Sequence, residues 1–419
     1  MDGFEKYYRK NWEQRLEVLI KQAKLNKQQV ELLKINAQDP NLGETMIENF
    51  ITQYSLPEGL ALNLVVNDKE YLVPMVTEEP SVIAAASHGA GIVKRVGGFR
   101  AKIHERLMLG QVVCENVSDA VALQTYFKEN ESSLLDCANQ AHPSIVKRGG
   151  GARWLRSRVL AADLVSLDLA VDVQEAMGAN MLNTMLEAVA QKIISECNQD
   201  ILMSILSNYA TECLVSATCQ IPVNALAKNG ISGEKIAAKL AQASRLAQLD
   251  PYRAATHNKG IMNGIDAAVL ASGNDWRAIE AGAHAYAAKD GQYRGLSQWY
   301  VEGEVLKGEL TLPLPLGSVG GSISIVPLVK VNHDLLNFKG AKELETVIVS
   351  LGLAQNLAAL YALVTEGIQK GHMSLQLKSL AVSVGAKDTE IAQVVQLLKQ
   401  QGLRDSKSAK EILKQLRKE

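Results

Sequence analysis

The sequence has few cysteines and no recognisable metal-binding spacing. Its five cysteines form no Cys-x-x-Cys pair, and their odd number does not suit a disulfide framework. No two of the seven histidines have the His-x-x-x-His spacing of a helical zinc site. We therefore expect the cysteines to be small buried residues and expect no bound metal. A metal-dependent hydrolase or lyase is the less favoured class of enzyme.

An excess of charge of one sign is also lacking. The 44 basic residues nearly cancel the 45 acidic ones, and no long basic block suggests a nucleic-acid binder. The first ten residues are charged and lack the apolar core of a signal peptide, and no uncharged apolar run reaches the length of a membrane span. We expect a soluble, cytoplasmic protein whose partners are small molecules or protein subunits.

The sequence has no Gly-x-Gly-x-x-Gly motif after a strand, but a weaker indication of a nucleotide-binding site is present. Residues 165–173 alternate between apolar and polar side chains, which predicts a half-buried strand. The strand leads into Glu-Ala-Met-Gly-Ala-Asn at 175–180, and an apolar helix face begins at Met181. Strand, glycine turn and helix aim free N–H groups at a phosphate, and Gly178 would allow a close approach. A plain turn is the alternative and the more common meaning of such a glycine.

The length of 419 residues predicts two or three domains. Residues 1–36 are expected to form amphipathic helix that ends at Asp39-Pro40-Asn41. Residues 60–66 and 71–76 are predicted strands, and a buried helix should follow with Pro80 at its first position. The glycines at 317–321 precede an alternating run at 323–329 and indicate either a tight backbone approach or a hairpin connection.

Three charged or titratable residues stand in segments that suggest chemistry. Lys259 lies between Asn258 and Gly260, and Asp275 lies in Gly-Asn-Asp-Trp, so both are predicted in short turns that point into a pocket. A lysine held near a carboxylate can stabilise an oxygen that becomes negative during a reaction. His372 adjoins a glycine at the start of a small helical module and could deliver a proton after water is excluded. The alternative is that the lysine and aspartate are solvated loop charges.

Five ordered strings together resemble one enzyme family. They are residues 78–85, 175–180, 256–264, 273–277 and 371–373, and in this order they are similar to class II (soluble bacterial) 3-hydroxy-3-methylglutaryl-coenzyme A (HMG-CoA) reductase. The resemblance implies an α+β multidomain fold, with a small α/β cofactor domain of non-Rossmann type inserted in a large helix-rich substrate domain, and a helical C-terminal flap. The implied bounds are 1–108 and 217–366 for the substrate domain, 109–216 for the cofactor domain and 367–419 for the flap.

The resemblance also implies the reaction and the residues that perform it. HMG-CoA would be reduced reversibly to mevalonate and coenzyme A in two steps with two NAD(P)H, by a homodimer or dimer-based oligomer with shared active sites. Lys259 would stabilise the carbonyl oxygen, His372 protonate the departing thiolate and Glu79 protonate the aldehyde, with Asp275 linking Lys259 to Glu79. Implied substrate contacts are Ser81, Arg253, Asn263 and Gln355, and implied cofactor contacts are Asp172, Glu175, Met177, Gly178 and Asn180. Family members often have Asp where this chain has Glu175.

The cofactor preference is predicted from residues 136–154. This segment corresponds to the one that places an acidic side chain against the ribose in NADH-preferring members, and here it contains Asp136 but also Lys147, Arg148 and Arg153. We expect NADPH to be preferred and NADH to be accepted. The alternative is that these basic residues are solvated surface charges. Two other functions stay open at this point: a non-catalytic coenzyme A or nucleotide scaffold, and a metal-dependent acyl-CoA hydrolase or lyase.

Overall fold

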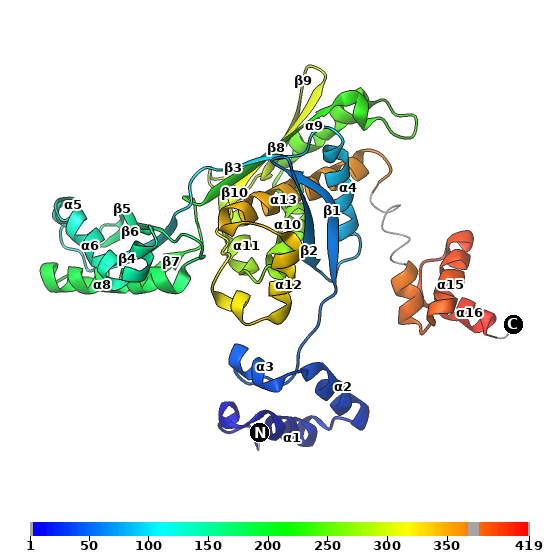
Figure 1. Cartoon of the computed structure of the whole chain (residues 1–419), viewed down its shortest axis with the longest axis horizontal. Helices are drawn as coiled ribbons and strands as arrows, with labels where there is room; N and C mark the ends of the chain where they lie inside the picture. Colours follow the sequence, from blue (N-terminus) through cyan, green and yellow to red (C-terminus); the bar gives the residue numbers. More distant parts are fainter. Residues whose placement is uncertain (1–2, 368–376, 418–419) are drawn as a thin grey trace. The chain divides into compact units, whose positions relative to one another are not determined.

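A computed structural model describes residues 3–367 and 377–417, and the chain divides into two compact units, Met1–Pro57 and Glu58–Glu419. The first unit is helical (Figure 1). Its elements are η1 (Tyr7–Arg9), α1 (Trp12–Ala23), α2 (Lys27–Ala37) and α3 (Pro40–Met46).

The first unit corrects two expectations about the N-terminal helix. The amphipathic segment is interrupted, because Asn26 starts a second helix through a capping box with Gln29. Asp39 and Pro40 begin a helix where the sequence suggested an end. The Asp39 side chain accepts hydrogen bonds from the backbone of Asn41 and Leu42, and Pro40 occupies the first helical turn, where its missing N–H costs nothing.

The second unit opens with a two-stranded ribbon. Strands β1 (Glu58–Val66) and β2 (Lys69–Val76) pair antiparallel around Asn67 and Asp68, both with positive φ, as the sequence predicted. Helix α4 (Val82–Lys94) follows, but Pro80 is not its first residue. Ser81 stands between them as the N-cap with φ 76°, and this left-handed conformation delays the start of the helix.

A four-stranded antiparallel sheet and long helices form the large core of this unit. The strand order is β3 (Arg100–Ile103), β8 (Leu214–Pro222), β10 (Val305–Pro313) and β9 (Ser297–Glu302). The helices are α9 (Gly233–Leu249), α10 (Pro251–Ala271), α11 (Trp276–Ala287), α12 (Pro327–Leu336) and α13 (Gly340–Val364), with the short helix η2 (Val223–Leu226) after β8. Within the described residues, α13 is the one helix long and apolar enough to cross a membrane, and 78% of its most apolar window is buried. Helix α13 is therefore a buried core helix.

The alternating run at 323–329 does not form a strand. Residues 323–329 contain the end of η3 (Gly321–Ser324) and the start of α12, where Pro327 takes the first helical turn. The apolar alternation there was too short to outweigh the proline.

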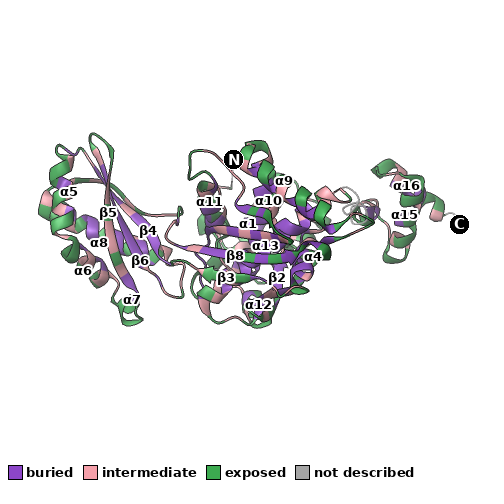
Figure 2. Ribbon diagram, turned by 90° about the horizontal axis from the view of Figure 1, so that it is seen from above, coloured by how far each residue is buried: buried purple, intermediate pink, exposed green. Residues whose placement is uncertain are grey.

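A second sheet and its helices have a core of their own. Strands β5 (Gly151–Ala161), β6 (Leu164–Asp172), β4 (Met108–Glu115) and β7 (Asp200–Ser207) pair antiparallel in that order. Helices α5 (Ala120–Glu129), α6 (Glu131–Ala141), α7 (Pro143–Lys147) and α8 (Ala179–Cys197) lie on one side of this sheet (Figure 2). Strand β6 confirms the predicted strand, because Val165, Leu167, Leu169 and Val171 all join the core that it forms with α8. The expectation that it is half-buried is wrong, because Ser166, Asp168 and Ala170 on its other face are buried as well.

Antiparallel pairing throughout excludes the parallel Rossmann sheet among the described strands. The fold is mixed α+β, as predicted, while the domain bounds remain a prediction. The C-terminal helices α15 (Asp388–Gln401) and α16 (Ser406–Leu416) have a separate small core that includes Val394, Val395 and Leu398. All five cysteines are free thiols, and Cys114, Cys213 and Cys219 are buried.

Candidate active site

Helix α10 carries the predicted lysine, which corrects the expectation of a turn. Asp250 caps α10 and Pro251 begins it, and the helix continues without a break through Lys259 to Ala271. The neighbouring Asn258 suggested a turn, but its buried side chain donates to the carbonyl of Arg294 and accepts from the N–H of Leu296, both at 2.8 Å. The polar residue is therefore a packing contact inside a helix.

Lys259 contacts a carboxylate from a distant segment of the chain. Its Nζ lies 2.5 Å from Oε2 of Glu79, in the loop between β2 and α4. One turn later on α10, Nδ2 of Asn263 lies 3.5 Å from Oε1 of the same carboxylate. The side chains of Lys259 and Glu79 are 57% and 37% exposed. A cation and a carboxylate are thus held together where a substrate can reach both.

Four buried side-chain atoms have no partner among the described residues: Nδ1 of His257 and Oδ1 of Asp266 on α10, and one atom each of the predicted substrate contacts Ser81 and Gln355. Oγ of Ser81 is buried and unpaired, and the backbone of Ser81 is left-handed. Oε1 of Gln355 on α13 is likewise buried and unpaired. Gln355 packs against α10, because a Cβ added to Gly264 would lie 3.0 Å from the Gln355 Cβ. Orphan polar atoms and backbone strain are costly and concentrate at functional sites.

Arg253 offers a half-buried guanidinium on α10. No carboxylate in the described part of the chain pairs with it, and burial lowers the pKa of its side chain. Burial, with a smaller contribution from Arg253, lowers the pKa of His257 to about 3, so this histidine is neutral. Nε2 of His257 lies 2.6 Å from Oγ of Ser297, so this buried histidine makes a packing contact within the core. Arg253 is therefore a cation with free donors for an anionic ligand.

Asp275 lies at the start of α11, as the turn prediction required. Its carboxylate accepts from the backbone of Arg277 at 3.1 Å and Ala278 at 3.2 Å and pairs with the Arg277 side chain at 3.6 Å. Among the described contacts of Asp275, none reaches Lys259 or Glu79. Its predicted link between these two residues stays a prediction. His372 lies outside the described residues.

The predicted cofactor segment has the expected geometry. Strand β6 ends at Asp172, Gly178 has φ 84° and caps α8, and Met177 between them is half-buried. Only glycine suits position 178, because its conformation is left-handed and a Cβ would lie 2.4 Å from Val173. Asn180 is exposed in the first turn of α8. This confirms strand, glycine turn and helix, while nucleotide contact stays a prediction.

The two acidic residues of this segment already have protein partners. Asp172 accepts from Arg153 at 2.8 Å and from Gln174, and Glu175 accepts from Oγ of Ser318 and the N–H of Ala341, both at 2.7 Å. Burial raises the pKa of both carboxyls, but the hydrogen bonds outweigh burial, so both pKa values are lowered. Both groups are therefore anions held by the protein itself.

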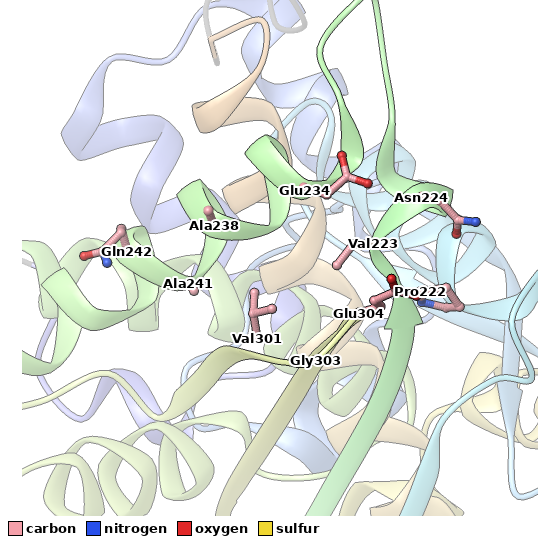
Figure 3. A pocket seen from close by; sticks show the side chains of 10 residues that line it. All are labelled: Pro222, Val223, Asn224, Glu234, Ala238, Ala241, Gln242, Val301, Gly303 and Glu304. Carbon is pink, nitrogen blue, oxygen red and sulfur yellow. The ribbon is translucent and has the colours of Figure 1, made fainter.

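A pocket of about 640 Å³ lies elsewhere, between α9 and the turn of the β9–β10 hairpin (Figure 3). It contains the carboxylates of Glu234 and Glu304 but no basic side chain, and none of the predicted site residues lines it. Among the residues that the structure describes, no group of three or more His, Cys, Asp or Glu side chains could hold a metal ion.

Arg106, Glu345 and Asn274 are not among the residues predicted from sequence, although they join the cofactor segment to the loop of Asp275. Arg106 donates to Glu345 and to backbone carbonyls at 174 and 176, and Asn274 binds the backbone of Gly317. No motif marks Arg106 or Glu345. Asn274 lies beside Asp275, which was a usable signal.

Comparison with known proteins identifies the family. The family model described as hydroxymethylglutaryl-coenzyme A reductase matches residues 11–377. A 3-hydroxy-3-methylglutaryl-coenzyme A reductase of Archaeoglobus fulgidus is 38% identical over 415 residues, covering 98% of this chain and 94% of that relative. The chain belongs to the hydroxymethylglutaryl-coenzyme A reductase family.

Further relatives agree with this assignment. A probable HMG-CoA reductase of Borreliella burgdorferi is 35% identical over 336 residues, covering 80% of this chain and 77% of the relative. A structure of the class II HMG-CoA reductase from Streptococcus pneumoniae, bound to NADPH in open conformations, is 49% identical with a TM-score of 0.77 and covers 97% of this chain and 100% of that chain. The resemblance to class II HMG-CoA reductase is confirmed. The chain is an NAD(P)H-dependent oxidoreductase that reduces HMG-CoA to mevalonate.

Proposed function

We propose that Lys259 and Glu79 supply the charge and proton chemistry of HMG-CoA reduction. The observation that carries this proposal is the 2.5 Å contact between Nζ of Lys259 and Oε2 of Glu79, two residues 180 positions apart in the chain. Each hydride addition places negative charge on the acyl oxygen, and a fixed ammonium group stabilises that charge. The adjacent carboxyl group is placed to give the oxygen its proton.

NAD(P)H supplies a hydride in each of the two reductive steps. In the first step a hydride adds to the thioester carbon and gives the oxyanion of a hemithioacetal, with Lys259 beside the negatively charged oxygen; the oxyanion becomes the aldehyde carbonyl when it expels the thiolate. His372 then protonates the thiolate of coenzyme A as the carbon–sulfur bond breaks, and an aldehyde remains. In the second step Glu79 protonates the aldehyde oxygen, and Asp275 keeps Lys259 and Glu79 in place. Two nicotinamides are oxidised and two protons taken up for each coenzyme A released.

The remaining polar residues suit the acyl group of the substrate. Arg253 would bind the glutaryl carboxylate with two N–H donors. Oε1 of Gln355 is an acceptor that suits a substrate hydroxyl, and Oγ of Ser81 can donate or accept. Asn263 would bind between the substrate and Glu79. The two orphan atoms support this assignment, because a buried polar atom without a partner costs about 1–3 kcal/mol.

NADPH is the proposed cofactor, with NADH accepted. The side chains of Lys147 and Arg148 are exposed, and the relative from S. pneumoniae was solved with NADPH. Arg153 is less available, because it pairs with Asp172. Cofactor contacts are proposed at Met177, Gly178 and Asn180, whereas Asp172 and Glu175, which the resemblance also implied, already have protein partners. For the two carboxylates the proposed role is to shape the turn.

We also propose that the protein is a cytoplasmic homodimer with shared active sites. Its proposed domains are a substrate domain of residues 1–108 and 217–366, a cofactor domain of residues 109–216 and a flap of residues 367–419. Exposed apolar side chains at the corner of α9 and α10 support a subunit partner: Leu249 is 60% exposed and Tyr252 is 90% exposed.

The stoichiometry of the reaction tests the proposed function. With HMG-CoA and either NADPH or NADH, purified protein should oxidise two nicotinamides per thiol released, and the initial rate should be higher with NADPH. Turnover should persist in excess chelator, because no metal takes part. Thiol release without nicotinamide oxidation would indicate an acyl-CoA hydrolase, and binding without turnover would indicate a scaffold. A tenfold preference for NADH would overturn the cofactor assignment.

A further inference from the structure

A buried arginine stands where the two sheets of the second unit are connected. Arg106 follows β3 and precedes β4, and its side chain is 5% exposed. Nε of Arg106 donates to Oε1 of Glu345 on α13 at 2.8 Å, and the Glu345 side chain is 1% exposed. Burial raises the pKa of Glu345 to about 7, although Arg106 opposes this rise. A pair so deeply buried needs further hydrogen bonds to offset its desolvation.

The other donors of Arg106 supply those hydrogen bonds, and they all point to two backbone segments. Nη1 donates to the carbonyl of Gln174, and Nη2 donates to the carbonyls of Ala176, at 3.2 Å, and Leu316. The N–H of Leu316 also donates to Glu345, at 3.3 Å. One guanidinium therefore joins the turn after β6 to the segment after β10.

The same two segments are also joined directly. The carbonyl of Glu175 accepts from the N–H of Ser318 at 2.8 Å, and the Glu175 carboxylate accepts from Oγ of Ser318 at 2.7 Å. Gly317 has no room for a side chain, because a Cβ would lie 2.9 Å from the backbone nitrogen of Met177. The turn is thus held on residues 316–318 by the bonds of Glu175 to Ser318 and by the close approach of Gly317 to Met177.

Residues 316–318 are tied in turn to the loop of Asp275. Oδ1 of Asn274 accepts from the N–H of Gly317 at 2.7 Å, and Nδ2 of Asn274 donates to its carbonyl at 3.0 Å. Asn274 immediately precedes Asp275 in the chain. Hydrogen bonds therefore connect Glu345 through Arg106 to the turn at 174–177 and to residues 316–318, and the backbone of Gly317 within this segment bonds to Asn274.

We infer that Arg106 is a positioning residue for the nicotinamide cofactor: it fixes the turn at 174–178 relative to the loop of Asp275 and so sets where the hydride donor lies. The inference rests on the proposed role of this turn in cofactor binding. Lysine cannot replace arginine here, because one ammonium group cannot reach Glu345 and three carbonyls that lie in different directions. The loss of Arg106 should therefore weaken cofactor placement more than substrate binding.

The test is Arg106→Lys in the full-length enzyme, which keeps the charge opposite Glu345. We expect KM for NADPH to rise about tenfold, as for the loss of one or two buried hydrogen bonds, while KM for HMG-CoA changes less than about twofold. The isotope effect with 4-deuterated NADPH should also increase, because a misplaced donor makes hydride transfer more rate-limiting. The control is Arg100→Lys on β3, whose partner Asp68 is exposed, and it should leave both KM values unchanged.

Asn274→Ala is the second variant, because Asn274 is only half-buried and its loss releases Gly317 without leaving a buried charge. Asn274→Ala should also weaken NADPH binding, measured by fluorescence titration without turnover. If Arg106→Lys does not fold, this variant alone tests whether the anchored turn positions the cofactor. Equal rises in both KM values, or a lower melting temperature with unchanged KM values, would overturn the inference. Failure of the proposed function is distinguishable, because the unmodified enzyme would then not oxidise NADPH with HMG-CoA.

Discussion

Replacement of Lys259 by alanine should separate catalysis from stability. The side chains of Lys259 and Glu79 are 57% and 37% exposed, so their ion pair contributes only about 0–1 kcal/mol to the free energy of unfolding. The same ammonium group, placed beside a developing oxyanion, contributes about 3–4 kcal/mol to the transition state, or roughly 10²–10³ in kcat. Lys259→Ala should therefore lose at least about a hundredfold in kcat while its unfolding midpoint stays close to that of the parent.

The assay follows NADPH absorbance with saturating HMG-CoA, together with urea unfolding of the same preparations. Lys94→Ala is the matched control, because Lys94 at the end of α4 and Glu70 on β2 form an ion pair of 2.6 Å with 39% and 50% exposure. It should show the same small stability change and full activity. A loss of less than about tenfold in kcat for Lys259→Ala would refute the assigned role. A large loss of stability would show that the pair is structural.

Three further changes test other parts of the site and the fold. His372→Gln should impair reduction of HMG-CoA more than reduction of free mevaldehyde, because only the thioester expels a thiolate; equal losses in the two assays contradict the role. Arg253→Lys should raise KM for HMG-CoA about tenfold, because lysine cannot bind the substrate carboxylate through two N–H donors. The control is Arg245→Lys at an exposed position, and an unchanged KM for Arg253→Lys would contradict the prediction. Burial and neighbouring Glu280 raise the pKa of Asp266 to about 9. The protonated carboxyl group therefore makes its full contribution to the free energy of unfolding below about pH 4, and this contribution is lost as pH rises toward 9. Asp266→Asn should therefore unfold at higher urea than the parent at pH 8, and an advantage confined to pH 5 would show that the sign is wrong.

Secondary structure was predicted correctly where a regular alternation of apolar residues matched the face that packs into a core. Strand β6 was found from the alternation at 165–173 because every second side chain enters the core with α8. The helical conformation of Lys259 was missed because Asn258 and Gly260 are residues that commonly form turns. The helix is determined instead by its Asp250-Pro251 start and by the contacts of Asn258 with residues 294–296, which no local pattern contains.

The site itself is assembled from segments far apart in the chain, and this limits what spacing alone can predict. Lys259 and Glu79 became a candidate pair only because five ordered motifs pointed to a family. Arg106 and Glu345 are 239 positions apart and lie in no such motif, so only the three-dimensional structure brings them together.

The ion pairs Lys259–Glu79 and Arg106–Glu345 differ in exposure and in the roles proposed for them. The Lys259–Glu79 pair is open to solvent, so its charges cost little to hold and are free to act on a substrate. The Arg106–Glu345 pair is almost wholly buried, and removal of one partner would leave the other charge unpaired in the core, at a cost of about 3–5 kcal/mol. We propose that a cofactor turn anchored to the buried pair keeps its position while the exposed pair acts on the substrate, so that both hydrides can reach the same carbon.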